Sequence, residues 1–163
     1  VYALDETNKP WAYIRIKDEN ILEIVKNIAG YLEKRISSKT KITVATQLPE
    51  DQTVPINRYL FEWVIENLCK NAVDAMDGKG EFKVTIIDIP EGVAIDLADT
   101  GKGIPKSKYK SVFKPGYTTK KRGWGLGLSL CKRIIENYHD GKIFVLHSEE
   151  GKGTTFRILL KRG

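Results

Sequence analysis

The pattern of apolar residues constrains the fold of this chain more than any other feature. Apolar residues recur at helical spacing in three stretches, at about 20–37, 57–77 and 126–138. The strand-like stretches between them are residues 12–17, 41–46, 82–89, 93–98, 142–147 and 154–160. Because most of these strands are neighbours joined by short turns, they predict a mixed, mostly antiparallel sheet with three helices on one face. The expected fold class is α+β, a two-layer α/β sandwich.

Capping and turn residues mark the expected boundaries. Asp18 is the predicted N-cap of the first helix and Asn57 that of the second, which ends before Gly78. Residues 48–55 are predicted to form a loop. Residues 99–125 form a long connection rich in Gly, Lys and Thr, with one helical turn near 106–113. A connection of this length in a compact domain is usually functional or disordered.

The 163 residues suffice for one domain with a sizeable core. Residues 1–11 are polar without a clear period and are expected to form a linker, which leaves 12–163 as the domain. No apolar run approaches the roughly 18–20 residues of a membrane helix. The chain begins with Val1 rather than Met, so we expect a piece of a larger protein. A cytoplasmic location is expected as well. Cys69 and Cys131 show no CxxC spacing and are predicted to be buried free thiols of a reducing compartment.

Positive charge is concentrated in one segment. The chain has a formal net charge of +6, and the basic residues from Gly101 to Arg122 have no Asp or Glu among them. They are Lys102, Lys106, Lys108, Lys110, Lys114, Lys120, Lys121 and Arg122. Such a run indicates either a solvated loop or a segment attracted to phosphate, and charge alone does not distinguish a nucleotide from a nucleic acid.

One face of the predicted helix at 57–77 carries amide and carboxyl groups. Asn67, Asn71 and Asp74 stand at i, i+4 and i+7, next to the apolar stripe. The asparagines fit either packing and capping roles or an oxygen ligand for Mg²⁺. Magnesium takes few protein ligands and completes its octahedron with water and phosphate oxygens.

A second group follows the strand at 93–98. Asp99 ends that strand, and Gly101 and Gly103 come directly after it. The group fits a plain glycine turn, or a site where backbone approaches a flat ligand and Asp99 accepts a hydrogen bond from the exocyclic amine of adenine. Guanine presents a carbonyl there, and an unpaired acceptor costs about 1–3 kcal/mol, so the second interpretation predicts a preference for ATP over GTP.

Two further turns are rich in glycine. Gly123, Gly125 and Gly127 open the third helix, where free backbone N–H groups and the helix field favour anions. Gly151 to Thr155 form a hairpin turn whose hydroxyls either reach a ligand or only shape the turn. The chain has neither a Rossmann fingerprint nor a P-loop of the form GxxxxGK(S/T).

The order of these motifs carries a resemblance that none of them carries alone. NLCKNAVDAM, DTGKGI, VFKPGYTTK, GWGLGL and GKGTTF resemble, in this order, the N, G1, F, G2 and last glycine boxes of the GHKL ATPase superfamily. The match spans about residues 21–161 and is most similar to bacterial sensor histidine kinases. It implies a Bergerat-type ATP-binding fold, with ATP and Mg²⁺ as cofactors. It also implies a catalytic domain separated from the helices that carry the phosphoacceptor histidine.

The resemblance implies roles at matching positions. Asn71 is implied as the Mg²⁺ ligand, and Asn67 as a catalytic group that supports metal or phosphate. Asp99 is implied to fix adenine, with Thr154 acting through water. A lid over about 106–123 is implied to cover ATP, with Lys120 favoured to reach the terminal phosphates. The other implied nucleotide contacts are Asp74, Gly101, Gly103, Ile104, Phe113, Thr119, Lys121, Arg122, Gly123, Gly125, Leu126, Gly127 and Leu128.

One departure from the superfamily is informative. Its hydrolysing members, of the gyrase and heat-shock chaperone types, have a water-activating glutamate four residues before the metal-binding asparagine. Here that position is Asn67, an amide that cannot accept a proton, and Glu66 lies about 100° around the helix. The site is therefore expected to hold ATP for transfer and not for hydrolysis.

The expected partners lie outside the chain. Neither of its histidines, His139 and His147, is expected to be the phosphoacceptor. A dimerisation domain of the same kinase would supply that residue, with a response regulator downstream. The chain itself is expected to be monomeric, to show little autophosphorylation and to bind no nucleic acid. The alternatives are a serine kinase of the anti-sigma-factor type, a nucleotide-binding module without catalysis, and a basic nucleic-acid binder.

Overall fold

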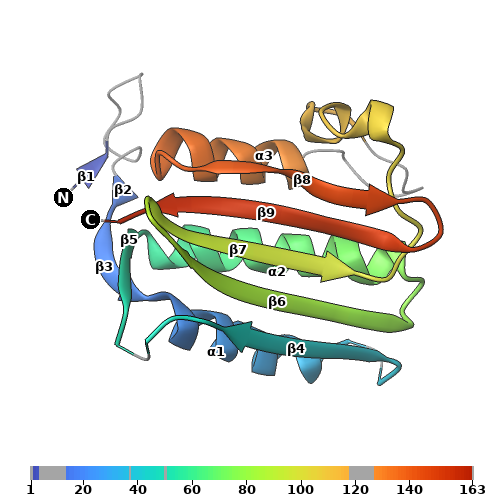
Figure 1. The fold of residues 1–163 in the computed structure, drawn as a ribbon, viewed down its shortest axis with the longest axis horizontal. Coiled ribbons are helices and arrows are strands. Elements are labelled where there is room, and N and C mark those ends of the chain that lie inside the picture. Colours follow the sequence, from blue (N-terminus) through green and yellow to red (C-terminus); the bar gives the residue numbers. More distant parts are fainter. Residues whose placement is uncertain (1, 4–13, 37, 50, 118–126, 163) are drawn as a thin grey trace.

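Three helices cover one face of a five-stranded sheet (Figure 1). The computed structural model describes residues 2–3, 14–36, 38–49, 51–117 and 127–162. The helices are α1 (Ile21–Glu33), α2 (Arg58–Ala75) and α3 (Gly127–Arg133), and a π-helical turn at Ile134–Tyr138 continues α3. None of the helices in the described residues is long and apolar enough to cross a lipid bilayer.

The large sheet has the strand order β4-β6-β7-β9-β8. These strands are β4 (Thr40–Thr46), β6 (Gly80–Ile89), β7 (Gly92–Asp99), β8 (Lys142–Glu149) and β9 (Gly153–Lys161). β4 runs parallel to β6, and the other three pairs are antiparallel. The four remaining strands pair as two small antiparallel ladders, β1 (Tyr2–Ala3) with β2 (Ile14–Arg15) and β3 (Lys17–Asn20) with β5 (Thr53–Ile56). The predicted two-layer fold with a mixed sheet is confirmed.

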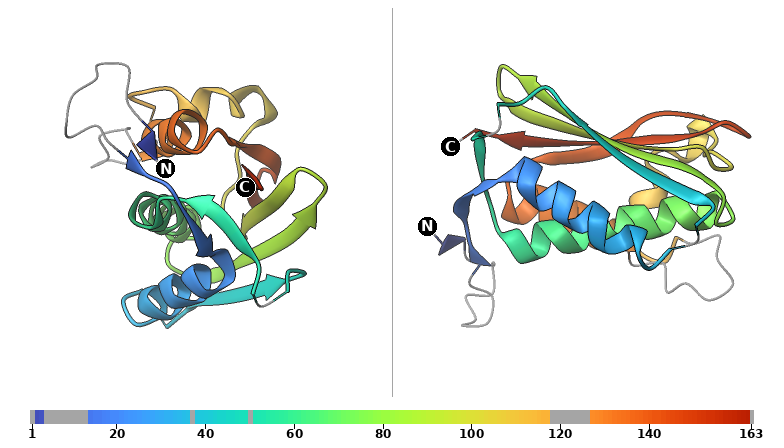
Figure 2. Two further views of the ribbon diagram at one scale, coloured as in Figure 1. Left: turned by 90° about the vertical axis from the view of Figure 1, so that its left-hand side faces the viewer. Right: turned by 90° about the horizontal axis from the view of Figure 1, so that it is seen from below.

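The core lies between the helices and the sheet. Alternate residues of β6 point to the helices, so Phe82, Val84 and Ile86 are buried while Glu81 and Lys83 are exposed. α2 lies between α1 and α3 under the sheet (Figure 2). Because α2 contacts helices on both sides and the sheet above, its residues are well placed to connect distant parts of the chain.

The structure corrects three predictions in the part of the chain before α2. The N-cap of α1 is Asn20, whose Oδ1 accepts a hydrogen bond from Glu23 N at 3.0 Å, and not Asp18, which lies within β3. Part of the loop predicted at 48–55 forms β5, because β3 offers it an antiparallel partner. The strand predicted at 12–17 is replaced by β2 and β3, which pair with different strands.

The ring of His139 joins the end of the third helix to the start of the second. Its Nδ1 lies 2.8 Å from the carbonyl oxygen of Ile134, which can only accept, so Nδ1 carries the proton. Nε2 then accepts a hydrogen bond from the backbone N–H of Asn57 at 3.0 Å. Asn57 is the predicted N-cap of α2, and its Oδ1 accepts from Leu60 N at 3.0 Å. A neutral imidazole therefore holds this junction between two helices.

We expect the fold to lose stability below about pH 6.5 because of His139. Burial lowers the pKa of His139 below its ordinary value of 6.5, against the opposing effect of its hydrogen bonds with Ile134 and Asn57. The unfolded state therefore takes up the proton first, so the contribution of His139 is complete above about pH 6.5. It decreases below that pH by at most about 1.4 kcal/mol per pH unit. Thermal melts of the wild type and His139→Gln between about pH 5 and pH 8 measure the difference.

The exposed His147 on β8 provides the control for this experiment. His147→Gln should keep the pH dependence of the wild type, because the His147 side chain is exposed and does not join two helices as that of His139 does. Identical pH slopes for the wild type and His139→Gln would contradict the assigned role of His139.

Candidate functional site

Three polar side chains form a row across neighbouring strands at one end of the sheet. Asp99 ends β7, Thr154 lies near the start of β9, and Ser148 lies near the end of β8. The register pairs Asp99 with Thr154 and Thr154 with Ser148. The next row on the same face is buried and apolar and consists of Leu97, Phe156 and Val145. The face toward the helices thus changes from apolar to polar at Asp99, Thr154 and Ser148, which we call the polar row.

One oxygen of the Asp99 carboxylate is fixed by the backbone. Oδ1 accepts hydrogen bonds from Gly101 N at 2.8 Å and from Thr154 N at 3.3 Å. Burial raises the pKa of Asp99 above its ordinary value of 3.8, and these two hydrogen bonds offset part of the effect. No residue that the structure describes donates to Oδ2. The second oxygen therefore offers an acceptor to a ligand.

The glycines after β7 allow close contacts between loops and neighbouring elements. A Cβ on Gly101 would lie 2.6 Å from the carbonyl oxygen of Ala75, at the end of α2. A Cβ on Gly103 would lie 2.2 Å from the carbonyl oxygen of Glu149, at the end of β8, and Gly103 has φ +80°. Both glycines thus bring backbone against backbone within the protein, whereas the sequence predicted an approach of backbone to a ligand.

Asn67, the first of the two predicted site asparagines of α2, lies opposite the start of α3. The two helices pack antiparallel, with Cys131 Sγ 4.0 Å from the carbonyl oxygen of Val64. One turn further along α2, Asn67 Nδ2 donates to the carbonyl oxygen of Trp63 at 2.9 Å. The other amide atom of Asn67, Oδ1, faces Gly127. A Cβ built on Gly127 would lie 3.5 Å from this oxygen.

The same face of α2 continues to the loop after β7. Asn71 lies one turn beyond Asn67, past the first residue of α3. One more turn leads to Ala75, whose carbonyl oxygen accepts a hydrogen bond from Lys102 N at 2.9 Å. The side of α2 that carries Asn67 and Asn71 therefore spans the interval between α3 and the polar row.

Aromatic residues anchor the segment after this loop. Two short 3₁₀ helices, Lys106–Lys108 and Ser111–Phe113, stand where one helical turn was predicted. Phe113 is 7% exposed and packs edge-on against Phe156, with ring centroids 5.9 Å apart. The Lys132 ammonium of α3 lies 5.6 Å from the Phe113 ring centroid. Phe113 thus joins the segment to both the sheet and α3.

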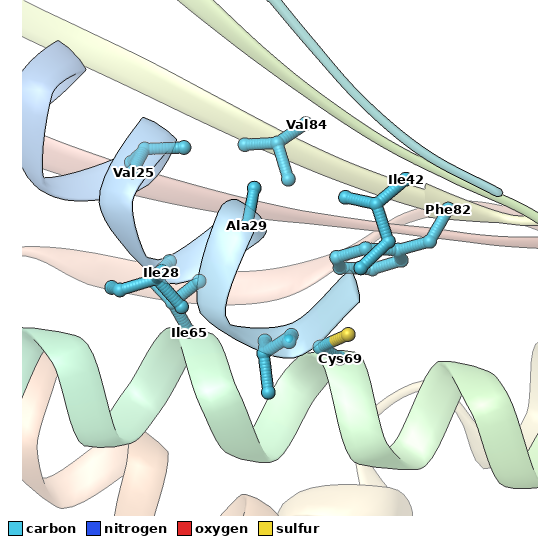
Figure 3. Close-up of a pocket in the computed structure, with 9 residues that line it drawn as sticks. Val25, Ile28, Ala29, Ile42, Ile65, Cys69, Phe82 and Val84 are labelled. Carbon is cyan, nitrogen blue, oxygen red and sulfur yellow. The ribbon is translucent and has the colours of Figure 1, made fainter. Parts of the chain in front are cut away.

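A small pocket elsewhere in the fold has the wrong chemistry for a nucleotide. It lies between α1, α2 and strands β4 and β6, on the side of α2 away from α3 (Figures 2 and 3). Its lining is apolar apart from one thiol and consists of Val25, Ile28, Ala29, Leu32, Ile42, Ile65, Cys69, Phe82 and Val84. Burial raises the pKa of the Cys69 thiol to about 11, so the thiol is neutral and unreactive. Without polar groups to orient a ligand, the pocket is a packing gap of the core.

Comparison with known proteins identifies the family. The family described as histidine kinase-, DNA gyrase B-, and HSP90-like ATPases matches residues 57–163, which include α2, the polar row and α3. The chain belongs to this ATPase family. The matched part of the chain also contains Asn67 and Asn71 of α2.

Within the family, this chain is similar to sensor histidine kinases. The catalytic domain of histidine kinase ThkA is 30% identical, with a TM-score of 0.82 over 91% of this chain and 97% of that domain. A structure of ThkA in complex with response regulator protein TrrA is 27% identical, with a TM-score of 0.80 over 97% of this chain and 45% of that one. Sporulation kinase C of Bacillus subtilis is 32% identical over 93% of this chain and 35% of its own length.

These similarities make the chain the ATP-binding catalytic domain of a sensor histidine kinase. The serine-kinase alternative is not favoured, since the relatives are two-component histidine kinases. The chain spans about a third or less of the length of the curated relatives that it matches.

The kinase domain brings part of the predicted site together. Ile104 N donates to Ser148 Oγ at 2.7 Å, next to Thr154, and Leu128 packs half-buried against the core. Asp74 is exposed on α2. The predicted residues Thr119, Lys120, Lys121, Arg122, Gly123, Gly125 and Leu126 lie outside the described residues.

Ser148 belongs to the polar row although the sequence does not predict it. Strict alternation from Ile143 and Val145 would turn His147 toward the helices. A bulge between Val145 and His147 shifts the register, so Ser148 pairs with Thr154 and His147 is exposed. The only sequence signal is a small polar residue near the end of a strand, which is too common to be informative.

Proposed function

We propose that this domain binds Mg-ATP between α2, α3 and the polar row and transfers the γ-phosphoryl group to a histidine of a dimerisation domain in the same kinase. The observation that carries the proposal is the face of α2 that runs from α3 to the loop after Asp99. Asn67 and Ala75 are separated by eight helical steps, about 12 Å along the helix. That length suits a nucleoside polyphosphate, with the base at Asp99 and the phosphates beside Asn67 and Asn71.

The end of the site at Asp99 fits adenine. Oδ2 of Asp99 is an acceptor, and the exocyclic amine of adenine is a donor. Guanine would place a carbonyl against the carboxylate, which supports a preference for ATP over GTP. The apolar row of Leu97, Phe156 and Val145 adjoins Asp99 and offers a surface on which a flat base can pack.

The end of the site at the asparagines fits a magnesium ion bound to phosphates. The described residues contain no group of three or more His, Cys, Asp or Glu side chains that could hold a metal by themselves. The amide oxygens of Asn67 and Asn71 can supply one or two ligands, while phosphate and water supply the rest. When bound there, magnesium would neutralise charge on the transferring phosphoryl group.

The residues around Asn67 favour transfer over hydrolysis. Its amide cannot act as a base, and its Nδ2 is already bonded to the carbonyl oxygen of Trp63. The neighbouring Glu66 forms an ion pair with Lys70 at 3.2 Å and is 35% exposed. Neither side chain is placed to activate a water molecule, which supports a kinase over a hydrolase.

The acceptor histidine and the partners are proposed to lie outside this chain. Both ring nitrogens of His139 form hydrogen bonds with the protein, so His139 is a poor nucleophile. A response regulator is proposed downstream, as ThkA forms a complex with one. We further propose that residues 12–163 form a monomeric domain that binds no nucleic acid, with 1–11 as a linker. The buried free thiols Cys69 and Cys131 and the use of ATP support a cytoplasmic location.

Transfer to a separate domain tests the proposed function directly. The chain is mixed with dimerisation domains of similar kinases and ATP labelled at the γ-phosphate. Acid-labile phosphate on the added domain is the expected result. Acid-stable label would indicate a serine kinase instead, and nucleotide binding without any transfer would indicate a module without catalysis.

Asn71→Ala is expected to weaken ATP binding about tenfold with magnesium present and to change it little in the presence of a chelator. The reason is that the lost amide oxygen acts through the metal ion. Isothermal titration calorimetry with and without Mg²⁺ measures both affinities. Asn27→Ala on the exposed face of α1 is the control and should bind like the wild type. Equal losses with and without magnesium would argue against Asn71 as the ligand.

A further inference from the structure

The Ser148 hydroxyl is the centre of the hydrogen bonds around the polar row. Its Oγ lies 2.7 Å from Ile104 N, 3.0 Å from the carbonyl oxygen of Gly153 and 2.8 Å from Thr154 Oγ1. Ile104 lies in the loop after β7, and Gly153 and Thr154 are the first two residues of β9. One side chain of β8 therefore connects the loop after β7 to the start of β9 at the end of the sheet.

The donors and acceptors of these contacts can be assigned by counting protons. A serine hydroxyl donates one hydrogen bond and accepts two. The N–H of Ile104 can only donate, and the carbonyl of Gly153 can only accept. Ser148 therefore donates to Gly153 and accepts from Ile104, and its second lone pair accepts from the Thr154 hydroxyl. This arrangement alone satisfies all three contacts at once.

The assignment fixes what Thr154 offers to a ligand. Its hydroxyl proton points to Ser148, so Thr154 Oγ1 has only lone pairs left. Asp99 Oδ2, in the same row, is also an acceptor, because the backbone N–H groups of Gly101 and Thr154 bind Oδ1. The polar row thus presents acceptors only, which match an amine and repel a carbonyl.

The position of Ser148 is itself fixed by Tyr109. The Tyr109 hydroxyl accepts a hydrogen bond from Ser148 N at 2.8 Å and donates one to Ser148 O at 2.7 Å. Tyr109 thereby satisfies the backbone of β8 at the edge of the sheet, directly after the bulge. Tyr109 thus fixes the backbone of Ser148, and the three contacts of Oγ hold the side chain.

We propose that Ser148 is a positioning residue that sets the selectivity of the site for a 6-amino purine over a 6-oxo purine, by holding the Thr154 hydroxyl as an acceptor. The inference rests on the proposed binding of ATP at Asp99. Without Ser148, the Thr154 hydroxyl is free to rotate and donate to a carbonyl, so discrimination decreases.

The test compares ATP with inosine triphosphate, which carries a carbonyl in place of the amine. The Kd ratio is the Kd for inosine triphosphate divided by the Kd for ATP. In Ser148→Ala this ratio should fall about tenfold, because ATP binds more weakly and inosine triphosphate more tightly. Thr155→Ala is the matched control, because Thr155 neighbours Thr154 on β9 but faces the other side of the sheet, and it should keep the wild-type ratio. Equal weakening of both nucleotides in Ser148→Ala would overturn the proposal.

A double-mutant cycle separates positioning from a general structural effect. In the Thr154→Val background there is no hydroxyl to orient, so adding Ser148→Ala should leave the Kd ratio unchanged. If Ser148→Ala lowered the Kd ratio equally in the wild-type and the Thr154→Val backgrounds, the proposal would be overturned. If Ser148→Ala does not fold, two other variants test the proposal. Ser148→Thr must keep the wild-type Kd ratio, and Thr154→Val must lower it. An unchanged Kd ratio in Thr154→Val refutes the role of Thr154. A wild-type chain that binds neither nucleotide would instead refute the ATP site itself.

Discussion

Replacing Asp99 by asparagine is expected to lower the affinity for Mg-ATP about 100-fold while the fold remains intact. The asparagine Oδ1 can still accept from Gly101 N and Thr154 N, as the carboxylate does. Its amide nitrogen then replaces the free acceptor with a donor, which faces the amine of adenine. A favourable charge-assisted contact becomes a repulsive one, whose cost is consistent with a loss of this size.

The same substitution should not destabilise the domain. Burial raises the pKa of Asp99, so the folded state holds a proton more readily than the unfolded state, and the ionised carboxylate lowers stability at neutral pH. A neutral asparagine removes that unfavourable charge, and we expect a melting temperature equal to or above that of the wild type. Calorimetric titration and thermal melting at pH 7 measure the two effects.

Asp96→Asn is a matched control on the same strand. Asp96 points to the other side of the sheet and forms hydrogen bonds with Arg157 at 2.7 Å and 2.8 Å. It should bind ATP like the wild type, with no gain in stability. If Asp99→Asn bound ATP as well as the wild type does, the adenine site would have to lie elsewhere.

Gly101→Ala is expected to destabilise the domain by about 3 kcal/mol and to lower its melting temperature by about 9 °C. The added Cβ would lie 2.6 Å from both the carbonyl carbon and the carbonyl oxygen of Ala75 and 2.8 Å from its Cβ. Two of these atoms are backbone atoms of α2, so no rotation of a side chain relieves the clash. The loop must move away and lose the hydrogen bond from Lys102 N to Ala75 O.

ATP binding should weaken together with stability in Gly101→Ala, because Gly101 N also fixes Asp99 Oδ1. Chemical denaturation gives the change in the free energy of unfolding, and titration below the melting temperature gives the affinity. A variant with wild-type stability would show that the close contact between this loop and α2 is not needed.

Gly30→Ala provides the opposite expectation for the same type of substitution. Gly30 lies in α1, and apart from its chain neighbours and the backbone of its own helix a Cβ there would meet no atom within 4 Å. Alanine in place of glycine within a helix should therefore stabilise the domain by about 1 kcal/mol. Opposite signs for Gly101→Ala and Gly30→Ala would show that local packing, and not the removal of glycine as such, determines the outcome.

The sequence by itself determined the fold class and the family. The helical and strand periods of the apolar residues locate α1, α2, α3 and the five strands of the large sheet, because burial on one face imposes these periods. The order of Asn71, Asp99, Gly127 and Thr154 within their motifs indicates the family, which the comparisons confirm. Local chemistry also predicts the N-cap Asn57 correctly.

The tertiary structure decided which residues act together. β5 forms only because β3 lies beside it, and short segments of this kind carry no strong period of their own. The bulge in β8 places Ser148 in one row with Thr154 and Asp99. One extra residue in a strand turns the side chains of the residues that follow it to the opposite face of the sheet. Such contacts depend on register and on close packing between distant segments, which hydrophobic patterns leave undetermined.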